Sequence, residues 1–396
     1  MLSWHSLELV SCTKLQTLWA GYGYICAVTA RASTDAAAQK LDSLCRLQSA
    51  GTTGTTYRLI LKLISPPRDG RADEGHLRKM LSYEVEQYFY DQVVPRLSAD
   101  QVGVAQRLAS TRDRQTDELA GLTATLMTDL RPEYPVAGEK RAVLQPVQVT
   151  AALEWLARFH GASWAWLPDG DLDKYVLPPL EEASREDRGS KTWLNGGYTY
   201  LATRRSEYQS LVDDEDSEWC EALCTPVRGS SVAEMAAELL KPQGRDIESY
   251  IHGDVKSENL FTTQDGTRVA FFDFQYVGLG LGVCDLAKLF TCSVPLNMLV
   301  GDDDDEDELP EELGMRAGEK RLLEKYRHTL LASDGAKSIK YTWEDFKHHW
   351  ETALVDWCRF QASWGFWGNT EWLEARVRFI IRDAEWKDWL VRELSS

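Results

Sequence analysis

The chain has 396 residues, of which 43% are hydrophobic and 27% are charged, the composition of a folded globular protein rather than a disordered one. This length exceeds one ordinary hydrophobic core and predicts two lobes. The formal net charge of -18 argues against nucleic acid as a partner, because binding a phosphate backbone requires a basic face.

Three features of the sequence predict a cytoplasmic protein. No run of about 18 or more apolar residues, the length needed to span a membrane, is present. Residues 1–5 lack the basic and apolar regions of a secretory signal. The eight cysteines include no Cys-x-x-Cys pair, so we expect reduced thiols rather than a disulfide framework or a zinc site.

A hairpin is predicted over residues 15–31, with strands at 15–20 and 25–30 around a turn that contains Gly21 and Gly23. These glycines would allow the backbone to approach a ligand closely. An ordinary hairpin turn explains the same two glycines more readily when the stretch is taken alone. A connection rich in Gly, Ala, Ser and Thr then runs to about residue 56.

A lysine and a glutamate in successive elements suggest a phosphate site. Lys62 lies near the end of an apolar strand predicted over 57–64, and Glu86 lies at the edge of the apolar stripe of a helix predicted over 77–94. An ion pair of this kind orients ATP phosphates in kinase-type folds. The alternative interpretation is a lysine that snorkels at a strand edge and a half-exposed surface carboxylate.

A third strand is predicted over 122–130, and two prolines separate it from a long amphipathic helix predicted over 146–164. A hinge between two lobes belongs at this point. Adenine is therefore expected to meet backbone groups near Thr128 to Leu130. On the helix, His160 is predicted to be a structural histidine rather than a ligand.

The last hundred residues are rich in tryptophan. Aromatic and apolar side chains recur every three or four positions between Trp343 and Trp364, which predicts one stripe of a long helix. Most of them should form core, but a few could wall a binding pocket, because aromatic faces attract organic cations and pack on flat rings. The acidic run 302–308 is expected to be a solvated or disordered loop.

The polar residues that suggest a reaction lie between 250 and 275. A turn centred on Asp265-Gly266 predicts a hairpin in which residue 259 falls opposite residue 272, so Asn259 and Asp273 should meet at its open end. Carboxylate and amide oxygens suit Mg²⁺, which takes few protein ligands. Asp254, five residues before Asn259, is free to serve as a catalytic base for a hydroxyl group.

At this point the chain resembles the aminoglycoside phosphotransferase and choline kinase-like superfamily, and within it the ecdysteroid kinase-like group. The resemblance covers about residues 15–290 and leaves the aromatic C-terminus matched only in general character. Its motifs are His252-Gly253-Asp254-x-Lys256-x-Glu258-Asn259, Asp273-Phe274-Gln275, Glu86-x-x-Phe89-Tyr90, Leu156-Ala157-x-Phe159-His160-x-x-Ser163-Trp164 and Gly280-x-Gly282-x-x-Asp285.

The resemblance implies an α+β, two-lobed protein-kinase-like fold. A small N-terminal lobe, residues 1–128, would hold an antiparallel sheet and one helix, and a larger, mainly helical lobe, residues 129–396, would bind the acceptor. The implied roles are Asp254 as catalytic residue, Lys256 on the γ-phosphate, Asn259 and Asp273 as metal ligands, Lys62 and Glu86 as the phosphate-orienting pair, Gly21 and Gly23 over ATP, His252 as a brace of the catalytic loop and Asp285 as its support.

The sequence therefore predicts a small-molecule kinase that uses ATP and Mg²⁺ to phosphorylate a hydroxyl group of an organic acceptor. A catalytically inactive kinase-like protein that only binds a nucleotide or metabolite is the alternative. A protein kinase is disfavoured, because no activation loop or Ala-Pro-Glu-type segment follows Asp273. The acceptor stays open between a hydroxylated amine, aminoglycosides included, which net acidity and tryptophans favour, and a sterol-type alcohol.

Overall fold

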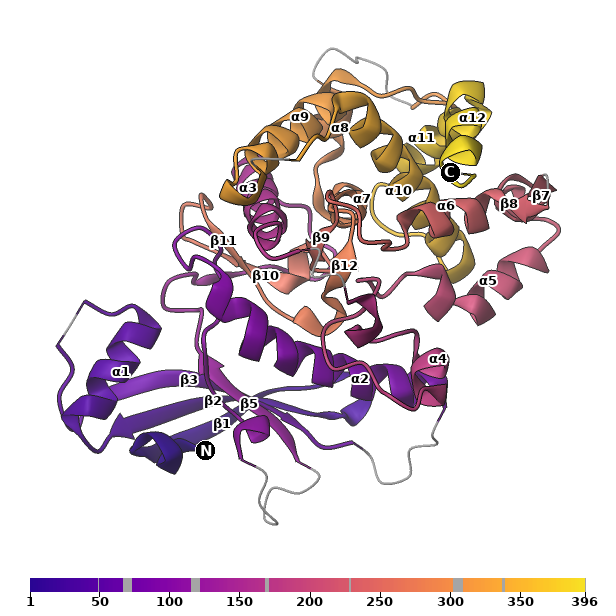
Figure 1. Cartoon of the computed structure of the whole chain (residues 1–396). Helices are drawn as coiled ribbons and strands as arrows, with labels where there is room; N and C mark the ends of the chain where they lie inside the picture. Colours follow the sequence, from indigo (N-terminus) through magenta and orange to yellow (C-terminus); the bar gives the residue numbers. More distant parts are fainter. Residues whose placement is uncertain are drawn as a thin grey trace.

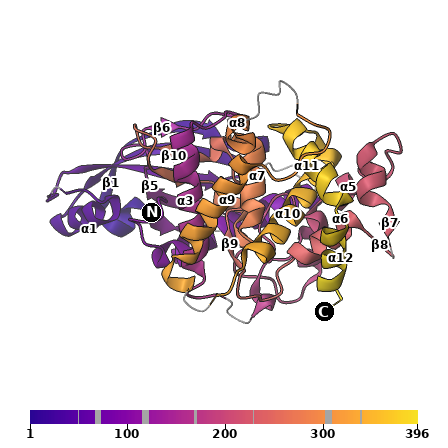
Figure 2. The ribbon, with the colours of Figure 1, turned by 90° about the horizontal axis from the view of Figure 1, so that it is seen from above.

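The computed structural model of the chain describes residues 1–48, 50–66, 73–114, 122–167, 171–227, 229–301, 309–336 and 339–395. A β-sheet with two helices makes up the N-terminal part, and a mostly helical C-terminal part lies beside it (Figures 1 and 2). The predicted α+β organisation is confirmed. The acidic run 302–308 lies outside the described residues.

Five antiparallel strands form the N-terminal sheet, in the spatial order β1-β2-β3-β5-β4. The predicted strands at 25–30, 57–64 and 122–130 are present, but the first strand begins at residue 7 instead of 15 and lies exposed at the sheet edge. Their bounds are β1 Leu7–Thr17, β2 Gly23–Ala32, β3 Thr56–Ile64, β4 Arg107–Ser110 and β5 Thr123–Thr128.

One helix of this part was missed. The segment predicted to be a connection contains α1 (Asp35–Cys45), whose N-terminus is capped by the Thr34 side chain and whose Ala37, Ala38 and Leu41 are buried. The alanines that resembled a linker are strong helix formers, and the apolar side of the helix packs with strands of the sheet.

The helix predicted over 77–94 is present as α2 (Glu74–Tyr88), and a wider turn continues it over Phe89–Val93. Its side chains contact both parts of the molecule. Gln87 Nε2 donates to Ser110 Oγ at 3.2 Å in the sheet. Arg78 Nη2 donates to the Thr203 carbonyl at 2.8 Å in the C-terminal part.

The C-terminal part is built around α3 (Pro146–Ser163), α7 (Val283–Ser293) and α10 (Trp343–Trp364). No helix in the described ranges is long and apolar enough to cross a membrane. The other elements are β6 Val136–Ala137, α4 Pro179–Ser184, α5 Arg205–Val212, β7 Pro226–Val227, β8 Ser230–Ser231, α6 Val232–Leu240, β9 Ser249–Ile251, β10 Leu260–Thr262, β11 Val269–Phe271, β12 Gly278–Gly280, α8 Leu296–Val300, α9 Ala317–Leu331, α11 Thr370–Arg382 and α12 Ala384–Glu393.

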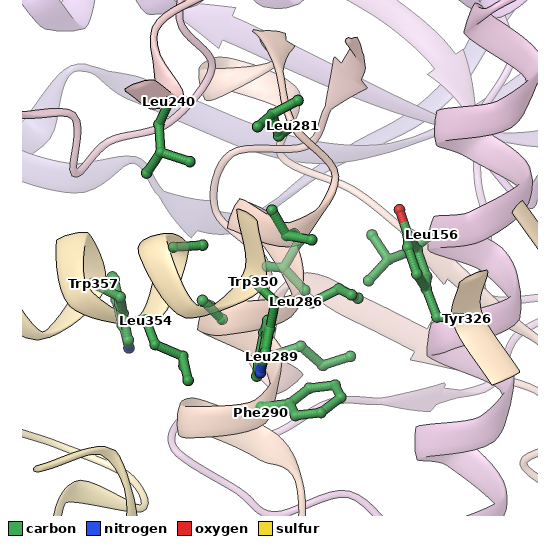
Figure 3. Packing of buried hydrophobic residues seen from close by; sticks show 14 of the residues in the cluster. Leu156, Leu240, Leu281, Leu286, Leu289, Phe290, Tyr326, Trp350, Leu354 and Trp357 are labelled. Carbon is green, nitrogen blue, oxygen red and sulfur yellow. The ribbon is translucent and has the colours of Figure 1, made fainter. Parts of the chain in front are cut away.

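The aromatic stripe of α10 is mostly core, as predicted. The Trp350 ring packs against that of Phe290 on α7, with centroids 5.0 Å apart, and Leu354 and Trp357 belong to the same core cluster (Figure 3). The last aromatic residue of the stripe, Trp364, is 50% exposed. Trp343, at the other end of the stripe, is partly buried.

A buried histidine of α10 predicts acid sensitivity. Burial lowers the pKa of His349 to about 3, so the neutral ring is favoured in the folded chain, and its Nδ1 lies 2.9 Å from the Tyr341 hydroxyl. Its contribution to stability is present above the unfolded pKa of about 6.5 and is lost as the pH falls towards the folded value. We expect a loss of about 2 kcal/mol between pH 6.5 and pH 5 from this group.

The measurement is urea unfolding of wild type and His349→Gln between pH 5 and pH 8. The difference in unfolding free energy between the two proteins should shrink as the pH falls below 6.5. The exposed His328 on α9 provides the matched control, His328→Gln, whose curve should run parallel to that of the wild type. Parallel curves for His349→Gln would contradict the prediction.

A second prediction concerns the stability of the chain and the glycine that begins β2 after the turn. Gly23 has φ +149°, and a Cβ there would lie 2.0 Å from the Leu63 carbonyl oxygen of β3. Because that neighbour is backbone, Gly23→Ala should destabilise the chain by about 1–3 kcal/mol or more. Gly54→Ala is the control, since Gly54 has φ +95° with nothing within 4 Å. Equal chemical denaturation midpoints for the two variants would refute the packing argument.

Candidate active site

A buried carboxylate holds the loop that follows β9. Asp285, on α7, accepts hydrogen bonds from the backbone N–H groups of His252 at 2.6 Å and Gly253 at 2.9 Å. His160 Nε2 lies 3.1 Å from the same carboxylate, and its Nδ1 lies 2.6 Å from the Tyr326 hydroxyl. His160 is therefore a satisfied structural histidine, as predicted.

His252 joins this loop to the neighbouring hairpin. Burial lowers its pKa, so the ring is neutral near pH 7. Its Nδ1 accepts from the Asp254 N–H at 3.2 Å, and its Nε2 then carries the proton and donates to the Phe272 carbonyl at 3.0 Å. The ring thus fixes the position of Asp254 relative to the segment that follows β11 and carries Asp273.

The hairpin has the register expected from its Asp265-Gly266 turn. Leu260 pairs with Phe271, and the Phe272 N–H donates to the Asn259 carbonyl at 3.0 Å. The next residue, Asp273, has a left-handed backbone with φ 66°, a conformation that is uncommon for residues other than glycine and that clusters at functional sites. Asn259 and Asp273 therefore leave the hairpin at the same end.

The carboxylate of Asp254 is oriented by its neighbours. Asn259 Nδ2 donates to the Asp254 carbonyl at 2.8 Å and to its Oδ2 at 3.0 Å. Lys256 Nζ lies 3.1 Å from Asp254 Oδ2 and 3.3 Å from Glu258. Burial would lower the pKa of Lys256, but these two carboxylates outweigh it and raise the pKa. A lysine cation is thus held beside Asp254.

The N-terminal part contributes a second charged pair. Lys62 Nζ, on β3, lies 2.5 Å from the Glu86 carboxylate of α2 and 3.2 Å from Asp273 Oδ1. The predicted contact between Lys62 and Glu86 is present. Lys62 also contacts Asp273, so it joins the N-terminal part to the C-terminal part. Burial works to raise the pKa of Asp273, but the charge of Lys62 prevails and the pKa is lowered.

Two hydrogen bonds in series, through the Gln275 amide and the Ser82 hydroxyl, connect Asp273 to α2. Gln275 Nε2 donates to Asp273 Oδ1 at 2.5 Å, and Ser82 Oγ of α2 donates to Gln275 Oε1 at 3.1 Å. The position of α2 therefore fixes both Glu86 and, through Gln275, the carboxylate of Asp273.

Apolar residues that the sequence did not single out share the sheet face of Lys62. Lys62 pairs directly with Ile25 on β2, and two positions along, Ile60 pairs with Ala27 and Met127. Because side chains alternate along strands, these residues lie on one face. They form an apolar surface beside the lysine. The alternation of side chains within β2 and β3 can be recognised in the sequence. Which alternate residues share the sheet face with Lys62 cannot, because the strand register decides it.

The other residues predicted to contact the nucleotide differ in how far their backbone groups are already engaged. Gly21 ends the turn after β1, and nothing lies within 4 Å of the position its Cβ would take. The Thr128 N–H donates to the Gln106 carbonyl at 2.9 Å, and the Leu130 carbonyl accepts from the N–H of Tyr134 at 2.8 Å. The Thr128 N–H and Leu130 carbonyl are thus engaged within the protein.

Two further observations bear on ligands. No group of three or more His, Cys, Asp or Glu side chains that could hold a metal occurs within the residues described. A cavity of about 20 Å³ lies behind the Asp254 loop, lined by residues that include Gly196, Lys288 and Trp357. That volume accommodates about one water molecule and excludes an organic ring.

Solved structures of kinases cover nearly the whole chain. A thermostable variant of the aminoglycoside phosphotransferase APH(4)-Ia, in a ternary complex with ADP and hygromycin B, is 12% identical with a TM-score of 0.41, covering 95% of this chain and 94% of that chain. The choline kinase LicA from Streptococcus pneumoniae is 12% identical with a TM-score of 0.39, covering 97% of this chain and 94% of its own. The ethanolamine kinase from Plasmodium vivax is 10% identical with a TM-score of 0.41, covering 97% and 84%.

No curated protein matches the sequence of this chain. The sequence profile of the ecdysteroid kinase-like family, in contrast, matches residues 43–305. The match includes β3 with Lys62, helix α2 with Glu86, and the whole segment from the Asp254 loop to Asp285. The chain belongs to the ecdysteroid kinase-like family.

Proposed function

We propose that the chain is an ATP-dependent small-molecule kinase that transfers the γ-phosphoryl group of Mg·ATP to a hydroxyl group of a small organic acceptor. The observation that carries the proposal is the 3.2 Å contact between Lys62 and Asp273. Through this contact the Lys62–Glu86 pair of the N-terminal part lies near the Asp254–Asn259 pair of the loop after β9. Kinases need these groups together.

The residues fit Mg²⁺ as well as a nucleotide. Asn259 uses its amide nitrogen on Asp254, which leaves its amide oxygen as a ligand, and Asp273 offers a carboxylate of lowered pKa. Mg²⁺ accepts two protein oxygens and completes its octahedron with water and phosphate. Asn259 and Asp273 would hold the ion, whose charge would offset that of the phosphate oxygens.

For the nucleotide, we propose that the apolar face formed by Ile25, Ala27 and Ile60 covers the adenine ring. The edge of the ring would meet backbone groups near Thr128 to Leu130, of which the Asp129 carbonyl and the Leu130 N–H lie between the two engaged groups. Lys62 would hold phosphate oxygens, with Gly21 and Gly23 above them. In this proposal the chain divides at 128/129 into a nucleotide lobe and an acceptor lobe.

In the transfer step, an acceptor hydroxyl would give its proton to the Asp254 carboxylate while its oxygen forms a bond to the γ-phosphorus. The bond between that phosphorus and the β–γ bridging oxygen breaks, and ADP leaves with the electron pair. Lys256, beside Asp254, would offset the negative charge that develops on the γ-phosphoryl oxygens. No group is oxidised or reduced in this step.

The experiment is an ATP-consumption screen over alcohols, amino alcohols, aminoglycosides and steroids with Mg·ATP, read against Asp254→Asn. Turnover that requires both an acceptor and Asp254 supports the kinase. Nucleotide binding without turnover on any acceptor would support the inactive binding protein instead. A cytoplasmic location stays a prediction.

A further inference from the structure

The backbone just before Asp254 has a conformation that favours glycine. Gly253 has φ +84°, and a Cβ there would lie 2.1 Å from the Tyr276 carbonyl oxygen. Glycine has no side chain that could anchor this conformation, and its backbone rotates more freely than that of any other residue. The orientation of Asp254 therefore depends on the groups that bond the peptide units on either side of Gly253.

Helix α7 bonds both sides of Gly253. Asp285 accepts the Gly253 N–H at 2.9 Å, and Lys288 Nζ, about one turn further along the helix, donates to the Gly253 carbonyl at 2.8 Å. That carbonyl belongs to the same peptide unit as the Asp254 N–H, which donates to His252 Nδ1 at 3.2 Å. Lys288 and His252 thus hold opposite edges of the peptide unit that leads into Asp254.

The ammonium group of Lys288 is buried behind the loop. Lys288 is 5% exposed, and a Cβ on Gly197 would lie 3.0 Å from its Nζ. It lines the cavity of about 20 Å³ together with Asp356 of α10, but Asp356 Oδ1 accepts from Arg359 Nη2 at 2.7 Å. The buried ammonium group is directed at the Gly253 carbonyl.

The charge of Lys288 is not required for packing. Taking an ammonium group out of water costs free energy, and an apolar side chain of similar length, such as methionine, would occupy the same space without that cost. A hydrogen bond from a charged donor is, however, roughly twice as strong as one between neutral groups. The lysine therefore restrains the Gly253 carbonyl more firmly than a neutral donor would.

We propose that Lys288 is a positioning residue for Asp254. Its ammonium group keeps the Gly253–Asp254 peptide unit from rotating and so keeps the Asp254 carboxylate directed at the acceptor hydroxyl. This role rests on the proposed function, because Asp254 acts as a base only there. The restraint on the peptide unit does not depend on that function, since it follows from the contacts of α7.

The first measurement is amide hydrogen exchange of the full chain, resolved to single residues by mass spectrometry with electron-transfer fragmentation. In Lys288→Met the Asp254 N–H should exchange about 10–100-fold faster than in the wild type, because its peptide unit loses a hydrogen bond from a charged group. The Gly253 N–H, which Asp285 still bonds, should change by less than about threefold.

The second measurement is the rate of acceptor phosphorylation. Lys288→Met should lower kcat about 10–100-fold and change the KM for ATP by less than about twofold, because the misdirected carboxylate acts on the acceptor and not on the nucleotide. Lys288→Arg keeps a cationic donor, and the adjacent cavity offers room for its larger head group. This variant should restore slow exchange at Asp254 and most of the lost kcat.

Leu289→Ala is the matched control for lost stability. Leu289 is the next residue on α7 and is fully buried in the apolar core (Figure 3). Its truncation should destabilise the chain, as large-to-small core substitutions do, without accelerating exchange at Asp254 more than at Gly253. If Lys288→Met does not fold, Lys288→Gln, a neutral donor of shorter reach, takes its place and should show the same difference between the two N–H groups.

Unchanged exchange at Asp254, or equal acceleration at Gly253 and Asp254, would overturn the proposal. Selective acceleration at Asp254 in Leu289→Ala would also overturn it, since lost stability would then explain the effect. Faster exchange in Lys288→Met with an undiminished kcat would refute the positioning role. Because exchange needs no turnover, the expected exchange pattern in a chain that transfers no phosphate would refute the proposed function and leave the restraint by Lys288 in place.

Discussion

Asp254→Asn is expected to reduce phosphoryl transfer by about 10²–10⁴-fold while the fold and nucleotide binding persist. The asparagine side chain has nearly the same shape, and its amide oxygen can still accept the hydrogen bond that Asn259 Nδ2 donates at 3.0 Å. The asparagine side chain cannot, however, take up the proton of the substrate hydroxyl group. The KM for ATP should change little, because Asp254 is proposed to contact the acceptor hydroxyl rather than the nucleotide.

The measurement is the rate of acceptor phosphorylation, together with a melting temperature recorded with and without Mg·ATP. Asp246→Asn removes an exposed carboxylate a few residues earlier in the chain and should retain the full rate. Near-normal transfer by purified Asp254→Asn would remove the proposed base. Loss of the nucleotide-induced rise in melting temperature would show instead that the substitution disturbs the ATP site.

Lys62→Met should abolish transfer and also destabilise the chain. The Lys62 side chain is 9% exposed and that of Glu86 is 8% exposed, so the substitution leaves a buried carboxylate without its partner. Breaking a buried pair in this way costs about 3–5 kcal/mol. The loss of a cation that would hold phosphate oxygens should reduce kcat/KM for ATP by at least about 100-fold.

The double variant Lys62→Met/Glu86→Leu separates these two effects. Replacing both charges by apolar groups removes the unpaired carboxylate, so most of the stability should return, because such replacements are often nearly neutral. Activity should remain absent. Urea unfolding and ATP kinetics are the two measurements, with the exposed Lys14→Met on β1 as control. Recovery of activity in the double variant would show that Lys62 acts through stability alone.

Local signals in the sequence were sufficient for the elements that carry the candidate site. A turn centred on Asp265-Gly266 predicted that Asn259 lies opposite Phe272, and the observed hairpin confirms this alignment. Apolar periodicity placed α2 and, within it, Glu86 on the side that faces Lys62. Each of these predictions depends on residues close together in the chain or on a single packing contact.

The aromatic cluster around Tyr198 could not be derived in this way. Arg204 is a charged residue, and nothing in its neighbourhood along the chain indicates that it is buried among aromatic rings. The cluster brings together Tyr198, Tyr276 and Trp364, which are far apart in sequence, so only tertiary packing makes it. The same holds for the apolar sheet face, because strand register decides which alternate residues lie beside Lys62.

Helix α2 is attached at several points along its length. It bonds the C-terminal part through Arg78, pairs with β3 through Glu86, and bonds the sheet through Gln87. A helix fixed in this manner cannot swing outward and withdraw Glu86 without breaking contacts to both parts at once. We therefore expect Glu86 to stay beside Lys62 whether or not a nucleotide is bound, so that the proposed site is already assembled before its ligands arrive.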